Sequence, residues 1–533
     1  MSNVAALFDV NASFGKPCTG GAEFPSIKDR LVTMDRLGIS RALVWNTESI
    51  QNHALSSNQA LLDEIRMTAG AEGRIFPALT VSNLLLYEHD GVAALARQLK
   101  SMPCHALRFA NVMGRLTLMQ LEPVVRQLRN LKPFIILKQD QAAVEDILEF
   151  SAAFPSVTLV LTDVMWSPCV IVFDLLRRRK NIMLDTSWLH SFGAIEVVVK
   201  HFGANRLFFG TGSKSHNGAA IAALARAELT TAQRRLIAHG NLDRLTELSA
   251  TPASSSRWTA NTLWPRFLEG KTLGVDVVDA HGHLGPSSGY VLEDQEERAQ
   301  LQAGLKVMDK IGVKTQLVSG MRAIMGAPAE GNALLETILR PHTDRVLGYV
   351  GFNPIYAGEL TPKFDQYFAG PVFKGFKTLC SYWRVDITDK RFAPMWDYAN
   401  RHSLPVLSHT WDGLYNSPSM FKDLVKRYPK IAFLLGHSGG GNNGRSEAEA
   451  LAQKHPNVYL EWCGSFCSTI CWEDTLKRVD PRQVVFGTDA MVHDFNWELG
   501  RLLSLDIPDK TLIPILGSNM RRILSLRKRP AKR

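Results

Sequence analysis

Short apolar segments rich in β-branched residues recur through the second half of the chain, and they predict buried β-strands. Apolar and polar positions barely alternate within them, as is typical of strands buried on both faces of a parallel sheet. Segments with helical periodicity, such as residues 297–311 and 421–427, separate most of these strands. The eight predicted strands comprise residues 275–283, 314–320, 346–353, 373–379, 404–410, 431–438, 458–463 and 483–490.

Eight β/α units within about 250 residues predict an α/β fold of the (β/α)8 TIM-barrel type. An open doubly wound sheet is the alternative. That fold would need a glycine-rich phosphate-binding turn after its first strand, whereas His281-Gly282-His283 stands there.

The first half of the chain repeats the signals of the second half in the same order. Residues 34–39 (MDRLGI) precede an apolar run, as residues 308–313 (MDKIGV) do, and residues 209–211 (FGT) match residues 486–488. The near-constant offset of about half the chain predicts a tandem duplication and therefore two tandem barrels. A small, polar, proline-containing stretch at the start of residues 249–273 predicts a linker between them.

Composition agrees with a globular chain that has material for two cores. The 533 residues are 45% hydrophobic and 21% charged, which excludes disorder, collagen and coiled coil as the main architecture. The net charge of +10 is spread over the chain, and the one dense basic run, residues 527–533, is expected to be a solvated tail. A nucleic-acid partner is therefore not expected, and neither is a membrane.

The chain lacks both an apolar run long enough to cross a membrane and an obvious signal peptide. Together with an odd number of cysteines, seven, this favours a reduced, cytoplasmic location. Cys463, Cys467 and Cys471 follow a C-x3-C-x3-C spacing that matches no zinc or iron–sulfur motif. We expect ordinary free thiols there.

Polar side chains with metal-binding chemistry gather where the predicted strands of the second half end. His281 and His283 are two apart on one strand, so both point to the same side and can bind one ion. His409 and His437 end two further strands, and Asp489 ends the eighth. Nitrogen and oxygen ligands suit Zn²⁺, with Mn²⁺, Fe²⁺ or Co²⁺ as alternatives. Such an ion with an open position lowers the pKa of a bound water from about 15.7 to about 7.

These motifs resemble the amidohydrolase superfamily and, within it, the amidohydrolase-related (amidohydrolase 2) group. The resemblance covers residues 275–526, and the group contains metal-dependent hydrolases, lactonases, hydratases and nonoxidative decarboxylases of small carboxylates. The matching segments are residues 279–283 (DAHGH), 373–377 (FKGFK), 404–410 (LPVLSHT), 435–440 (LGHSGG), 485–489 (VFGTD) and Asn519.

The resemblance implies a role for each matched position. His281, His283, His409 and Asp489 would bind one divalent ion, with zinc the first expectation. Asp489 would also be the general base that takes a proton from the metal-activated water. His437 would polarise the substrate or orient that water.

Three further residues are candidates for substrate binding, each with an alternative. Lys377 would hold a substrate carboxylate, but in some superfamily members a lysine on this strand is carboxylated and bridges two metals. Glu461 would lie near the site or be a packed glutamate. Trp411 would line the pocket or belong to ordinary aromatic packing.

The first half departs from the metal pattern at every corresponding position. No metal centre of this type can form there, because asparagine and serine are poor ligands for Zn²⁺ and the side chains of leucine and glycine are none. We therefore predict a degenerate, non-catalytic pseudoenzyme barrel at residues 1–248, before the linker at 249–273, the metal-dependent barrel at 274–526 and the basic tail. The altered positions are Asn11, Ser13, Arg108, Leu137 or Lys138, Asp163 and Gly212.

Two roles for the first barrel stay open at this point. It would replace a partner subunit, which gives an internal pseudo-dimer with or without further homo-oligomers. Alternatively, a pocket near Arg108 and Lys214 would bind an acidic ligand without turning it over.

The leading functional prediction is metal-dependent hydrolysis of a small amide, lactone or related carboxylate by the second barrel. The alternative reaction is nonoxidative decarboxylation of an aromatic or unsaturated acid. A non-catalytic binding or scaffold protein is the alternative of another class, and the intact ligand set of the second half argues against it.

Overall fold

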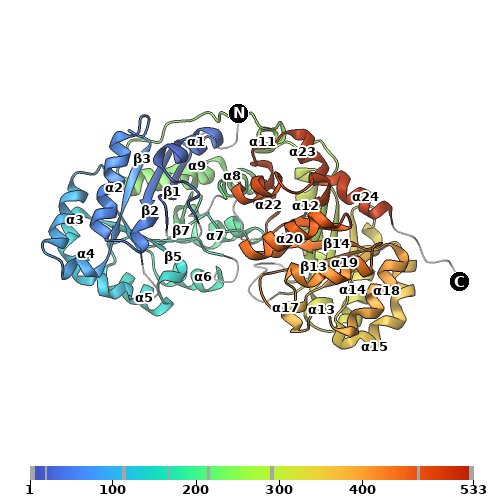
Figure 1. Cartoon of the computed structure of the whole chain (residues 1–533). Helices are drawn as coiled ribbons and strands as arrows, with labels where there is room; N and C mark the ends of the chain where they lie inside the picture. Colours follow the sequence, from blue (N-terminus) through green and yellow to red (C-terminus); the bar gives the residue numbers. More distant parts are fainter. Residues whose placement is uncertain are drawn as a thin grey trace. The chain divides into compact units, whose positions relative to one another are not determined.

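The computed structural model describes residues 6–17, 21–110, 116–165, 169–212, 216–287, 293, 295–464 and 469–526. The chain divides into two compact units between Thr259 and Ala260. In each unit, helices surround a set of strands (Figure 1). None of the described helices combines the length and the apolar character that a bilayer crossing requires. The basic tail, Lys214 and Cys467 lie outside the described residues.

The first unit contains an eight-stranded sheet whose strands follow one another in chain order, all in parallel. Its strands are β1 (Phe8–Phe14), β2 (Arg41–Asn46), β3 (Ile75–Val81), β4 (Ala106–Phe109), β5 (Phe134–Lys138), β6 (Leu159–Thr162), β7 (Ile182–Asp185) and β8 (Leu207–Phe208). Its helices are α1 (Ile27–Leu37), α2 (Ala54–Met67), α3 (Gly91–Lys100), α4 (Glu122–Leu128), α5 (Val144–Ala153), α6 (Cys169–Arg178), α7 (Ala194–Phe202), α8 (Asn217–Arg226), α9 (Thr231–Arg235) and α10 (Asn241–Thr246).

The second unit repeats this topology with strands β9 to β16, again parallel and in chain order. Its strands are β9 (Val277–Leu284), β10 (Val313–Gly320), β11 (Val346–Gly351), β12 (Phe373–Thr378), β13 (Pro405–His409), β14 (Ala432–Gly436), β15 (Val458–Trp462) and β16 (Val484–Phe486). Its helices are α11 (Leu263–Leu268), α12 (Glu297–Ile311), α13 (Met321–Met325), α14 (Pro328–Leu339), α15 (Ala357–Leu360), α16 (Phe364–Ala369), α17 (Cys380–Trp383), α18 (Ala393–His402), α19 (Lys422–Arg427), α20 (Asn442–Lys454), α21 (Thr469–Thr475), α22 (Phe495–Leu503), α23 (Asp509–Ile513) and α24 (Asn519–Ser525).

The prediction of two tandem (β/α)8 barrels is confirmed. All eight predicted strands of the second half are present, and the predicted helix 297–311 is α12 with the same ends. One difference concerns the last strand, which ends at Phe486 instead of residue 490. Three residues farther on, Asp489 adopts a left-handed backbone conformation, with φ 58°, which is incompatible with a strand that reaches residue 490.

A buried aspartate closes each barrel between its first and last strands. Asp9 accepts hydrogen bonds from the backbone N–H and the hydroxyl of Thr211, after β8. Asp279 accepts the same pair from Thr488, after β16, at 2.9 and 2.5 Å. Gln316 donates a further bond to Asp279 at 2.8 Å. Since buried backbone N–H groups need partners, these carboxylates complete the ring where ladder bonds are few.

The repeated sequence signals turn out to be structural devices. Gly38 and Gly312, in the MDRLGI and MDKIGV segments, end α1 and α12 with φ of 80° and 93°, a conformation that favours glycine. Asn58 forms hydrogen bonds to both the N–H and the C=O of Thr80, near the end of β3. Asn332 forms the same pair of bonds to Gly351, the last residue of β11.

Both barrels are filled by side chains from alternating strand positions, so neither is a pore. The core of the first barrel includes Phe8, Leu43 and Phe134, and that of the second includes Leu317, Tyr349 and Leu434. The buried ends of the strands position the polar groups described next.

Candidate metal centre

His281 and His283 project from β9 into one end of the second barrel. Their Nε2 atoms lie 3.2 Å apart, and both side chains are almost completely buried. The other ring nitrogens are held from outside: Nδ1 of His281 donates to Glu461 Oε2 at 3.0 Å, and Nδ1 of His283 lies 2.9 Å from the Ser319 hydroxyl. Both Nε2 atoms are therefore presented to a common point between the rings.

Asp489 brings a carboxylate to the same point. Its Oδ1 lies 2.9 Å from His283 Nε2 and 3.5 Å from His281 Nε2, and its backbone N–H donates to the His281 carbonyl at 2.7 Å. Burial alone would raise the pKa of Asp489, but His281 and His283 beside it hold that pKa well below its usual range. The group is an ionised ligand at neutral pH.

Burial lowers the pKa of all the clustered histidines, so their rings stay neutral and keep a lone pair for a metal. The pKa of His281 and of His409 falls well below its ordinary value, and that of His437 falls to about 4. His281, His283 and Asp489 place three ligand atoms within 4.8 Å of one another. Two imidazoles and a carboxylate whose ligand atoms face one another fit a divalent metal ion.

Glu461 lies beneath His281 and is fully buried. Its Oε2 accepts from His281 Nδ1 and from the backbone N–H of His437 at 3.1 Å, while Oε1 has no hydrogen-bond partner. Burial raises the pKa of Glu461 to about 8. Gly487 makes room for this carboxylate, because a Cβ there would lie 2.0 Å from Glu461 Oε1. The predicted substrate-binding residue thus lies behind a metal ligand.

His409, which ends β13, and His437, which directly follows β14, complete the histidine cluster. The His437 Nδ1 donates to the Cys463 carbonyl at 3.0 Å. The His409 ring lies 4.7 Å from the His437 ring, and its Nδ1 is buried without a hydrogen-bond partner. His409 borders the compact set of ligand atoms without belonging to it.

Lys377 and Trp411 occupy different depths of the site. Lys377 is buried on β12 with Nζ 2.6 Å from His281 Nε2, and burial lowers its pKa. It therefore lies inside the histidine cluster. Trp411 follows β13 and is half-buried, with its ring 5.8 Å from that of His437. A Cβ on Gly440 would lie 2.4 Å from the Trp411 ring, so the glycine allows the indole to pack there.

Sequence reasoning missed two members of the site. His493, four residues after Asp489, is buried with Nε2 4.0 Å from Asp489 Oδ2. Its Nδ1 lies 3.0 Å from Glu498, which in turn is paired with Arg501. Cys463 places its thiol 3.2 Å from His281 Nδ1. The H-x4-E spacing of His493 and Glu498 was the available signal, whereas nothing in the cysteine spacing indicated this contact. The cysteines that the structure describes are all free.

Comparison with known proteins agrees with this description. The model of the amidohydrolase family matches residues 278–526. Aligned solved structures include a 2,6-dihydroxybenzoate decarboxylase from Rhizobium and a 5-carboxyvanillate decarboxylase from Sphingomonas paucimobilis. Each is 14% identical, covers 47% of this chain and 99% of its own, and has a TM-score of 0.38. No curated protein matches the chain. The second barrel belongs to the amidohydrolase family, whose members are metal-dependent enzymes.

Proposed function

We propose that the second barrel is a metal-dependent hydrolase of a small amide, lactone or related carboxylate substrate. The observation that supports this most directly is the buried set of His281, His283 and Asp489, whose ligand atoms face one another at the end of the barrel where the strands finish. Family membership supports a metal-dependent enzyme.

His281, His283 and Asp489 would hold one divalent ion, with His409 approaching from the side. An ion there, Zn²⁺ or alternatively Mn²⁺ or Fe²⁺, supplies Lewis acidity that polarises a carbonyl and acidifies a water. Asp489 is ionised, and its Oδ2 is the oxygen turned away from the two histidines of β9 toward His493. That oxygen is our candidate for the general base that accepts the proton of the attacking water.

His437 would orient this water. Its Nδ1 faces a carbonyl oxygen, which only accepts hydrogen bonds, so Nδ1 carries the proton and Nε2 of the neutral ring is an acceptor. A pKa of about 4, lowered by burial, keeps the ring neutral at pH 7. Of the two roles considered for His437, accepting a hydrogen bond from water therefore fits better than donating one to a carbonyl.

Lys377 would bind the carboxylate of the substrate. Its Nζ now donates to the lone pair of His281 Nε2, and a metal ion at that nitrogen would take the same lone pair. A bound ion would therefore free the ammonium group for an anion. Glu461 would act indirectly by fixing the ring of His281, and Trp411 would border the substrate at the outer side of His437.

The test combines metal content with turnover. We expect about one divalent ion per chain by elemental mass spectrometry, and hydrolysis of some members of a panel of lactones, amides and related small carboxylates. His281→Ala/His283→Ala should lose both ion and activity. The matched control is Asn11→Ala/Ser13→Ala, at the corresponding positions of the first barrel, which should keep both.

Labelled water identifies the reaction class. Hydrolysis places oxygen from H₂¹⁸O in the product, whereas decarboxylation of an unsaturated acid does not. A chain that takes up no ion from Zn²⁺ or Mn²⁺ would refute the metal-dependent mechanism. Metal-dependent release of CO₂ without incorporated label would replace hydrolysis by decarboxylation.

A further inference from the structure

A cavity of about 400 Å³ lies at the end of the first barrel where its strands finish. This volume is in the range of small-molecule sites. Its lining comes from the ends of β1, β2, β4 and β5 and the loops that follow, and includes Phe14, Trp45, Thr47, Ile50, Arg108 and Lys138. The cavity therefore opens at the end of the barrel at which barrel enzymes bind substrates, and a small molecule could bind there without a metal ion.

Arg108 at the floor of this cavity is a buried cation with unused donors. Its side chain is on β4, and the residue is 2% exposed. Nη1 donates to Asn11 Oδ1 at 3.2 Å and to the Thr162 hydroxyl at 3.4 Å. Nε and Nη2 donate no hydrogen bond to any described residue. These two atoms form one edge of the guanidinium, the edge that can pair with both oxygens of a carboxylate.

The nearby acids do not form an ion pair with Arg108. Asn11 Nδ2 donates to Asp163 Oδ2 at 3.2 Å and to Asp185 Oδ2 at 3.0 Å, so an amide stands between the guanidinium and both carboxylates. Among the described carboxylates, none lies within 4.0 Å of the guanidinium nitrogens of Arg108. Burial, and the neighbouring Asp163, raise the pKa of Asp185 to about 8, which reduces the negative charge of the pair at pH 7. A buried guanidinium without a contacting anion is costly.

The walls of the cavity favour an apolar, planar body. The Arg108 guanidinium carbon lies 4.8 Å from the centre of the Trp45 ring, and Phe14 lines the same space. At the rim, Lys138 is partly exposed and paired with Asp140 at 2.7 Å. Asp140 therefore carries its own counter-ion, and Glu23 is the other carboxylate in the lining. Arg108 is the buried cation of the cavity, and no described carboxylate contacts it.

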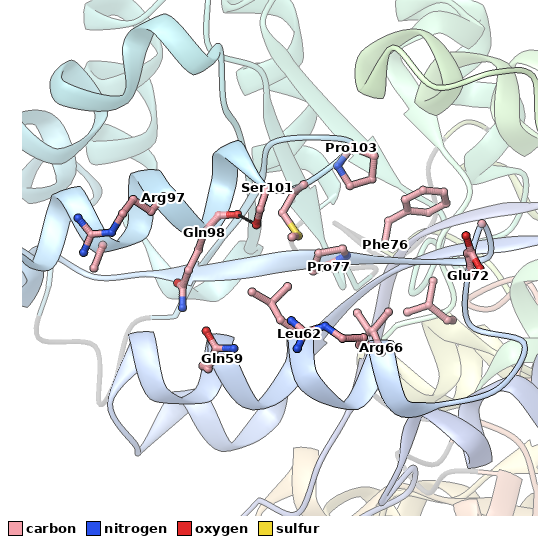
Figure 2. A pocket seen from close by; sticks show the side chains of 15 residues that line it. Gln59, Leu62, Arg66, Glu72, Phe76, Pro77, Arg97, Gln98, Ser101 and Pro103 are labelled. Carbon is pink, nitrogen blue, oxygen red and sulfur yellow. Dashed lines mark hydrogen bonds between the residues drawn. The ribbon is translucent and has the colours of Figure 1, made fainter.

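A larger cleft in the same barrel shows why Arg108 is unusual. About 690 Å³ in volume, this cleft lies between α2 and α3 beside the start of β3 (Figure 2). Its two exposed arginines are already paired, Arg97 with Asp90 at 2.5 Å and Arg66 with Asp63 at 3.2 Å. Neither has the buried, unpaired edge that Arg108 presents.

We propose that the first barrel binds a small planar carboxylate, whose two oxygens pair with Nε and Nη2 of Arg108 and whose apolar body lies against Trp45 and Phe14. The ligand would be bound without turnover, since Asn11 and Ser13 stand where the second barrel has its metal-binding histidines. The proposal does not depend on the function proposed for the second barrel.

Benzoate is a suitable probe, and benzamide is its neutral control. Equilibrium dialysis would use the full chain carrying His281→Ala/His283→Ala, so that a metal-bound carboxylate in the second barrel does not contribute. We expect one equivalent of benzoate per chain and at least tenfold weaker binding of benzamide, because charged hydrogen bonds to the guanidinium are lost.

Two variants in that background test the site. Arg108→Gln should weaken benzoate binding at least tenfold. Because this change disturbs a buried network, Ile50→Trp provides a second variant at a partly exposed wall of the cavity, where the larger side chain should occupy the space and also reduce binding. Binding that survives both variants, or no binding of benzoate at up to about 10 mM, would overturn the proposal.

Discussion

The two barrels close their rings in the same way and differ in what they enclose. Asp9 with Thr211 and Asp279 with Thr488 make the same hydrogen bonds between the first and last strands. Asn241 and Asn519 likewise each donate from the side-chain amide to two carbonyls before and within the eighth strand. These polar residues serve the scaffold, and a barrel keeps them whether or not it binds a metal.

The centres differ in how charge is arranged. In the second barrel, the imidazole of His281 donates to Glu461 and turns its other nitrogen toward Asp489. In the first barrel, the amide of Asn11 takes the place of the imidazole and donates to Asp163 and Asp185. An amide that uses its N–H groups inward offers no nitrogen lone pair to a metal. The comparison therefore separates residues that stabilise the barrel fold from residues that enable a barrel to bind a metal.

The largest expected effect is a loss of stability when Asp9 or Asp279, the aspartates that close the two barrels, is replaced. The loss should be similar in both barrels. Asp279→Ala leaves two N–H groups and two side-chain donors without their acceptor, and Asp9→Ala does nearly the same. We expect each change to lower the free energy of unfolding of its own barrel by about 2–4 kcal/mol. Hydrogen exchange of β1 and β9, in protein free of added metal, measures the two separately.

Each closing variant is the control for the other. Asp9→Ala should leave the protection of β9 unchanged, and Asp279→Ala should leave that of β1 unchanged. A loss confined to Asp279→Ala would mean that the shared hydrogen bonds contribute to stability in one barrel alone, and the structural equivalence drawn above would fail.

A smaller effect, on metal affinity, should distinguish the polar centres of the two barrels. Glu461→Gln replaces the carboxyl group that accepts the His281 Nδ1–H by an amide, a weaker acceptor, and this should weaken metal binding about 10–100-fold. Asp185→Asn is the matched change in the first barrel and should leave metal affinity as it is. Competition with a chelator of known affinity measures both. Equal metal affinity in Glu461→Gln and the wild type would show that the buried carboxylate does not tune its histidine.

The fold was predictable from sequence because its signals are local and repeated. Strands buried on both faces appear as continuous apolar runs, and the helix end at Gly312 follows from one residue that tolerates a left-handed backbone. The gathering of His281, His283 and Asp489 also followed from sequence, because parallel strands of a barrel all finish at the same end.

The depth of each side chain did not follow from sequence. Lys377 and Glu461 lie near the ends of their strands, as the other candidate residues do. The structure nevertheless buries both side chains beside His281, away from the rim of the barrel. Side-chain depth depends on packing from several strands at once, such as the space that Gly487 leaves for Glu461. His493 was missed for a related reason: a loop histidine has no strand periodicity to mark which way it points.

The smallest expected effect is a difference in pH dependence between the barrels. Burial and the adjacent Asp163 raise the pKa of Asp185 to about 8 in the folded chain, against about 3.9 for an unfolded aspartate. The native first barrel therefore binds a proton more tightly than the unfolded chain. This contribution to stability is complete below about pH 3.9 and is lost as the pH rises through about 8.

Asp185→Asn removes this titration while retaining a polar side chain. We expect the free energy of unfolding at β7 in the wild type to fall by roughly 1 kcal/mol between about pH 6.5 and 7.5, and in Asp185→Asn to stay nearly constant. Hydrogen exchange of β7, corrected for the intrinsic effect of pH on exchange, measures this decline, and strands of the second barrel should respond to pH alike in both proteins. The same decline in the free energy of unfolding at β7 in Asp185→Asn would show that Asp185 is not the titrating group. The electrostatic contrast between the two barrel centres would then rest on Arg108 alone.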